Sequence, residues 1–147
     1  MYIISACLVG ENCKYNGGNN SCRWVEEFAE THSHVLVCPE TEGGLAAPRP
    51  PAEIVGDKVI NSEGKDVTAE FSAGAAASYK RAMAAAAAAG EQVEGAILKA
   101  KSPSCGRDRI YDGTFSKTLT DGDGLFVRLM KNDNIKVITE KENIEND

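Results

Sequence analysis

The 147-residue sequence contains no apolar stretch of the roughly 20 residues that a membrane-spanning helix requires. Its N-terminus has no basic segment followed by a long apolar run, as a secretory signal peptide would have. Basic charge is in deficit, because 16 Lys and Arg stand against 22 Asp and Glu and leave a net charge of -6. Nucleic acids and anionic membrane surfaces favour a basic face. We therefore expect a cytoplasmic protein with neither nucleic acid nor membrane as a partner.

The sequence also lacks an even number of cysteines. It has five, at positions 7, 13, 22, 38 and 105, which cannot all close into intramolecular disulfides. In a reducing compartment, clustered cysteines more often indicate a metal site or catalysis. No C-x₂₋₄-C pair is present, and closed zinc sites need four ligands, so structural zinc is the less favoured metal.

Length and composition indicate one domain over residues 1–147, of which 141–147 form a solvated acidic tail. Short apolar runs predict buried strands, and longer amphipathic or Ala-rich stretches predict helices. Their alternation predicts an α/β fold with three layers and a mostly parallel, Rossmann-like sheet. A small β-hairpin is expected at 54–60, an irregular loop at 39–51, and Asp123 as the cap of the last helix. The expected strands are 2–6, 35–37, 96–99 and 135–138, and the expected helices are 21–31, 66 or 68 to 89, and 123–132.

Three of the cysteines, Cys7, Cys38 and Cys105, follow closely on predicted strands. Because ligands of parallel α/β sheets bind beyond the carboxyl ends of the strands, we expect these thiols to meet at one edge. Three thiolates suit an iron–sulfur cluster with one iron left open, although Cys13 is an alternative fourth ligand. The competing interpretation is that these are small buried apolar side chains, the role we assign to Cys22.

Seven sequence blocks together resemble the DUF523 family, in order and over most of the chain. They are SACLVG at 5–10, CKYNG at 13–17, CPE at 38–40, GGL at 43–45, PRPPAEI at 48–54, KSPSCG at 101–106 and IYDGTFS at 110–116. The sequence departs from the family at Asn16, at Lys117 and in the bulky start of the last helix, 124–126. These departures bear on the shape of the substrate pocket.

The resemblance implies a thiouracil desulfurase, an enzyme that removes sulfur from 2-thiouracil-type bases with a [4Fe–4S] cluster. Matched motif by motif, it implies Cys7, Cys38 and Cys105 as cluster ligands, with an open iron that binds the substrate sulfur. It implies Glu40 and Ser102 as catalytic residues, Glu40 activating water and Ser102 donating to the substrate or steering protons. We also expect two substrate-binding residues, Arg49 and Ser104.

Two other functions compete with this interpretation. One is sulfur transfer through a cysteine persulfide on Cys13 or Cys105, without a metal. The other is a non-catalytic module that binds a cluster or zinc and senses redox state. The iron and sulfide content of protein prepared without oxygen separates the three.

Overall fold

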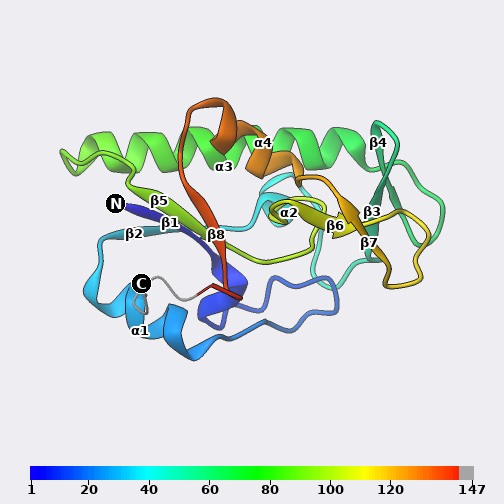
Figure 1. Ribbon diagram of the computed structural model, residues 1–147, viewed down its shortest axis with the longest axis horizontal. Helices are drawn as coiled ribbons and strands as arrows, with labels where there is room; N and C mark the ends of the chain where they lie inside the picture. The colour runs from blue at the N-terminus through cyan, green and yellow to red at the C-terminus, as the bar shows by residue number, and fades with distance from the viewer. Residues whose placement is uncertain (143–147) are drawn as a thin grey trace.

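A parallel four-stranded sheet forms the centre of the computed structural model, which describes residues 1–142 (Figure 1). The strand order is β2-β1-β5-β8, and every neighbouring pair is parallel. In the register, Ile3 lies opposite Val35 on one side and Ala96 on the other. The bounds are Tyr2–Ser5 for β1, His34–Val37 for β2, Gly95–Leu98 for β5 and Val137–Thr139 for β8.

Helices cover both faces of this sheet, so the predicted three-layer α/β architecture is confirmed (Figure 1). Alternate strand residues point to opposite faces. Ile3 faces α3 (Thr68–Ala88) and α4 (Leu125–Asn132), whereas Ile4 faces α1 (Arg23–Thr31). The Ala-rich sequence of α3 lets its backbone pack close to the sheet, because Ala75, Ala82 and Ala86 are buried there without bulk.

Two antiparallel hairpins lie beside the sheet, on the right in Figure 1. The first, β3 (Ala52–Val55) with β4 (Lys58–Asn61), is the hairpin that the sequence predicts. The second, β6 (Arg109–Tyr111) with β7 (Leu119–Asp121), was not predicted; its strands have three residues each, too few to show a clear pattern.

The prediction of an irregular loop over 39–51 is wrong at its start. A short helix, α2 (Pro39–Glu42), begins there, because proline at the first helical position needs no N–H and already has a helical φ.

The expected tail is only partly within the described residues. Lys141 and Glu142 are exposed, and 143–147 lie outside them. Within residues 1–142, no helix is both long enough and apolar enough to cross a bilayer.

Two glycines allow α2 and α3 to touch through their backbones. A Cβ atom at Gly74 of α3 would lie 1.6 Å from the carbonyl oxygen of Pro39, and one at Gly43 would lie 1.9 Å from that of Glu70. Neither atom can give way without moving a helix. The close contact fixes α2, and with it the residues that follow β2.

We predict that Gly74→Ala lowers the free energy of unfolding by about 1–3 kcal/mol, because the added methyl group forces α2 and α3 apart. In an exposed helix the same change would stabilise the protein by roughly 1 kcal/mol. Chemical denaturation measures the difference, with exposed Ser72→Ala on the same helix as the control. A Gly74→Ala protein as stable as the control would contradict the close contact.

Candidate active site

A cavity of about 390 Å³ opens beyond the carboxyl ends of β1, β2 and β5, a size suited to a small organic ligand. It brings together every site residue that the sequence predicts, from segments up to 98 positions apart. The predicted residues that line it are Cys7, Cys38, Glu40, Arg49, Ser102, Ser104 and Cys105.

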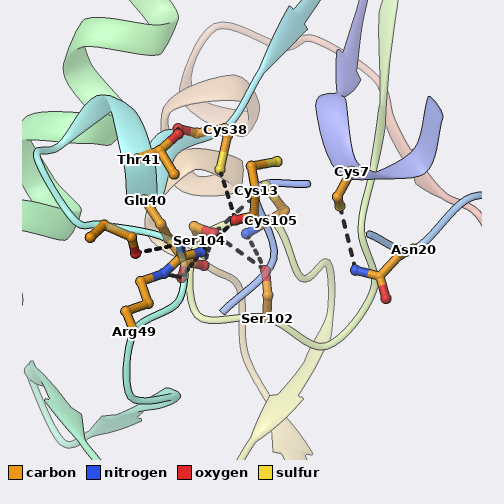
Figure 2. A network of polar contacts seen from close by, with 11 residues as sticks. Cys7, Cys13, Asn20, Cys38, Glu40, Thr41, Arg49, Ser102, Ser104 and Cys105 are labelled. Carbon is orange, nitrogen blue, oxygen red and sulfur yellow. Dashed lines mark hydrogen bonds and ion pairs between the residues drawn. The ribbon is translucent and has the colours of Figure 1, made fainter. Parts of the chain in front are cut away.

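Cys7 lies in a 3₁₀ turn, η1 (Ala6–Val9), directly after β1. The turn ends at Gly10, and the backbone N–H of Asn20 donates to the carbonyl oxygen of Cys7 at 2.9 Å. The side-chain amide of Asn20 donates to the Cys7 Sγ at 3.5 Å (Figure 2). Asn20 therefore holds both the backbone and the thiol of Cys7.

Cys38 follows β2 directly and is the residue before the first turn of α2. Its backbone N–H donates to Glu42 Oε2 at 3.1 Å. Glu42 in turn accepts hydrogen bonds from Ser78 Oγ and, at 2.7 Å, from Arg81 Nε, both on α3. Burial opposes ionisation of Glu42, but these hydrogen bonds outweigh it and hold its pKa below the ordinary value. The position of Cys38 thus depends on an ionised Glu42.

Cys105 lies in the turn Ser102–Gly106, which packs against the start of α4. Ser102 Oγ accepts from the Cys105 N–H at 2.8 Å. The N–H groups of Leu125 and Phe126 donate to the carbonyl oxygens of Pro103 and Ser104, at 2.9 and 3.0 Å. The prediction that Asp123 caps this helix is wrong: the cap residue is Gly124, and the carbonyls of the turn satisfy the free N–H groups. A Cβ atom at Gly124 would lie 2.4 Å from the Ser104 carbonyl, so the contact requires glycine.

Cys13, which the sequence leaves undecided, lies with the other thiols. Its carbonyl oxygen accepts from Cys38 Sγ at 3.8 Å (Figure 2). A hydrogen bond from its thiol lowers the pKa of Cys38 to about 6 and also lowers the pKa of Cys7. The same bonds raise the pKa of Cys13, and burial raises the pKa of Cys105 to about 12. Of the thiols in the cavity, Cys7 and Cys38 are the two whose pKa is lowered, and cysteine binds iron as the thiolate.

Glu40 and Arg49 form an ion pair on the floor of the cavity, with side chains only 16% and 8% exposed. Arg49 donates to Glu40 Oε1 from Nε at 3.2 Å and from Nη2 at 3.1 Å. Ser104 Oγ donates to Glu40 Oε2 at 2.8 Å (Figure 2). The remaining Arg49 donors bind the carbonyl oxygens of Cys13 and Ala46. Both predicted substrate-binding residues thus contact Glu40, and their contact with a substrate stays a prediction.

Several cavity residues are not among the catalytic, cluster-binding or substrate-binding residues that the sequence predicts, although Lys117 was noted there as a departure that bears on the shape of the pocket. Lys99 pairs with Glu140 at 2.8 Å, and Glu53 is a buried carboxylate on β3. Phe115 and Lys117 reach the cavity from the loop between β6 and β7. The sequence places Lys99 at the end of a predicted strand, but it does not predict that the Lys99 side chain lines the cavity. Cys22 is absent from the lining and packs around α1, as expected.

The donor set fits an iron–sulfur cluster. Such a cluster takes one thiolate per iron, so its ligands need not converge on one point. Among residues 1–142, no three His, Cys, Asp or Glu side chains converge closely enough for a single ion. Four cysteines, the three expected ligands and Cys13, nevertheless line the same cavity.

Comparison with known proteins identifies relatives over nearly the whole chain. The family model described as 2-thiouracil desulfurase matches residues 2–142. The protein YbbK of Bacillus subtilis (strain 168), described as uncharacterized, is 36% identical in an alignment of 152 positions that covers 97% of each chain. A solved structure of the [4Fe-4S]-dependent thiouracil desulfidase TudS is 38% identical. It superimposes with a TM-score of 0.81 over 95% of this chain and 90% of that one.

We predict that Glu42→Gln destabilises the protein in a pH-dependent way. The folded pKa of Glu42 lies below its ordinary 4.5, so its stabilisation is present above that pH and is lost as the pH falls through the folded pKa. The variant should be less stable by about 1–2 kcal/mol at neutral pH, the usual worth of hydrogen bonds to a charged group. The deficit should shrink on acidification below pH 4.5.

Denaturation curves at neutral and acidic pH measure this difference. Glu27→Gln is the matched control, because its exposed ion pair with Arg23 contributes little. A deficit that stays constant across the acid range would show that the charge of Glu42 is not what holds α2.

Proposed function

The chain belongs to the 2-thiouracil desulfurase family, and on that premise we propose that it removes sulfur from a thiolated pyrimidine such as 2-thiouracil. In this proposal Cys7, Cys38 and Cys105 hold a [4Fe–4S] cluster. Glu40 and Ser102 carry the proton transfers, and Arg49 and Ser104 bind the substrate. The observation that carries the proposal is the gathering of all seven residues around one cavity at the carboxyl edge of the sheet.

The reaction is a hydrolysis without net oxidation or reduction. The carbon–sulfur double bond of the substrate is replaced by a carbon–oxygen double bond, whose oxygen comes from water. Both protons of that water leave with the sulfur as hydrogen sulfide. When bound through three cysteines, the cluster supplies one iron with an open position that acts as a Lewis acid toward the soft sulfur atom.

Glu40 is the base that takes a proton from water. A general base must lie within hydrogen-bond reach of the proton that it removes and must keep a fixed orientation. Arg49 holds Oε1, and Ser104 holds Oε2 from the side of the cavity. These contacts direct the carboxylate and leave one lone pair on Oε2 for a water molecule.

Ser102 extends this arrangement to a second hydroxyl group. Its Oγ accepts from the Cys105 backbone, so its own proton is free to be donated. Ser104 Oγ lies 3.4 Å away and itself donates to Glu40. Once Glu40 is protonated, Ser104 Oγ can accept from it and donate to Ser102 Oγ, so the order Glu40, Ser104, Ser102 gives a path by which that proton returns toward the departing sulfur.

We predict that protein prepared without oxygen is brown and contains about four iron atoms and four acid-labile sulfides per chain. Cys38→Ala should lose the colour, because one of three ligands is gone. Cys22→Ala is the matched control and should keep it, since Cys22 lies outside the cavity lining. Absorbance and iron analysis provide the measurement, and Cys7→Ala and Cys105→Ala should behave as Cys38→Ala does.

Cys13→Ala decides how many cysteines are ligands. Retention of the cluster supports three ligands and an open iron. Loss of the cluster would contradict the open position. Colourless wild-type protein with one zinc per chain, or with persulfide sulfur and no iron, would replace the proposal by one of its competitors.

We predict that Glu40→Gln lowers kcat for sulfide release from 2-thiouracil by roughly 10²–10⁴-fold, the usual contribution of a general base. The iron content should stay unchanged, because Glu40 is not a proposed ligand and the amide oxygen of glutamine can still accept from Arg49. Exposed Glu30→Gln on α1 controls for loss of one negative charge. Unchanged turnover in Glu40→Gln would remove the carboxylate from the mechanism.

A further inference from the structure

Glu53 is a buried carboxylate on the wall of the candidate active site. It is the second residue of β3, and it is only 8% exposed. Its neighbours Ala52 and Ile54 pack on the other face of the hairpin, against Val59 and Phe71. The alternation of the strand therefore turns Glu53 away from that small apolar core and toward the cavity, which it lines.

One oxygen of Glu53 is fully engaged by the backbone. Oε1 accepts hydrogen bonds from the N–H groups of Gly113 and Phe115, at 3.0 and 3.1 Å. These bonds fasten the loop between β6 and β7 onto β3. They also fix the rotation of the carboxylate, so Oε2 is held in one direction.

The second oxygen has no hydrogen-bond partner among residues 1–142, and Glu53 forms no ion pair within them. Among residues 1–142, Arg107 Nε is the one side-chain atom that is both fully buried and without a hydrogen-bond partner. Glu53 Oε2 has no partner either, so it is not fully buried and contacts open space. Glu53 lines the cavity, so an oxygen that reaches open space is available there to accept a hydrogen bond from a bound molecule.

The cavity around this oxygen suits a flat ring. Tyr15, Tyr111 and Phe115 line it with aromatic surface. A thiolated pyrimidine of the proposed function presents ring N–H groups beside its thiocarbonyl carbon. A carboxylate only accepts hydrogen bonds, so it pairs with such an N–H and is left unpaired by an N-methylated ring.

We propose that Glu53 is a substrate-binding residue whose Oε2 accepts a hydrogen bond from a ring N–H next to the thiocarbonyl group. The site then selects rings that are unsubstituted at that nitrogen. This inference rests on the proposed function for its substrate class. It adds a recognition element distinct from the proposed cluster ligands and from Glu40.

Glu53→Gln is the variant that tests the inference. Its amide oxygen can still accept from Gly113 and Phe115, so the loop stays in place. Its NH₂ group, however, meets the ring N–H as a second donor. We expect the Kd of 2-thiouracil to rise roughly 10- to 100-fold, the range expected for losing a hydrogen bond to a charged group. Iron content and Tm should remain those of the wild type.

Methylated substrates separate recognition from a purely structural role. Wild-type protein should bind one of 1-methyl-2-thiouracil and 3-methyl-2-thiouracil much more weakly than 2-thiouracil. In Glu53→Gln the ratio of the Kd of that methylated ring to the Kd of 2-thiouracil should fall toward one. Glu63→Gln, an exposed glutamate just beyond β4, is the control and should preserve both affinity and discrimination.

Binding is measured by anaerobic equilibrium dialysis, with Glu40→Gln added to every protein so that turnover of 2-thiouracil is slowed during the measurement. The inference is overturned if Glu53→Gln binds 2-thiouracil with wild-type affinity, if its discrimination is unchanged, or if the wild type does not distinguish the methylated rings. It is also overturned if the wild type does not bind 2-thiouracil. Binding without sulfide release would instead count against the proposed function and leave the assignment of Glu53 standing.

Discussion

The ion pair between Arg49 and Glu40 is the contact on which the arrangement of the site depends. Arg49 donates to Glu40 and also to the carbonyl oxygens of Cys13 and Ala46, while Glu40 accepts from Ser104. These bonds join three segments that are distant in sequence: the loop around Cys13, the segment from Glu40 to Arg49, and the turn that holds Ser104. Both partners are largely buried, and removal of one partner from such a pair typically costs about 3–5 kcal/mol, because the other is left as an uncompensated charge. The pair therefore constrains the loops and the candidate base together.

The sequence predicts the fold well wherever one element can be read by itself. The four sheet strands were expected within about two residues, because each is a short apolar run between turn residues. The errors occur where a distant segment determines the local structure. Asp123 is a good helix cap in isolation, yet carbonyl oxygens of the Ser102–Gly106 turn take that role for α4. The short strands β6 and β7 likewise exist through their pairing with each other.

The same distinction applies to the site. Cysteines next to strand ends can be found from sequence, because parallel strands bring their carboxyl ends to one edge. Glu53 could not be found in this way. A glutamate between apolar neighbours in a hairpin strand is the ordinary pattern of a solvent-facing residue. Only the loop between β6 and β7, folded across β3, buries it and makes its carboxylate part of the cavity.

Two of the basic side chains that line the cavity are each paired with a carboxylate. Arg49 is compensated by Glu40, and Lys99 is compensated by Glu140, at N···O distances of 3.1 and 2.8 Å. Lys99 also lowers the pKa of Cys7, although the hydrogen bond from Cys13 has the larger effect. Because these two pairs carry no net charge, a neutral ring that contacts them need not displace a counter-ion. Selection among neutral rings then rests on the direction of donors and acceptors, and Glu53 supplies an acceptor whose direction the backbone has already fixed.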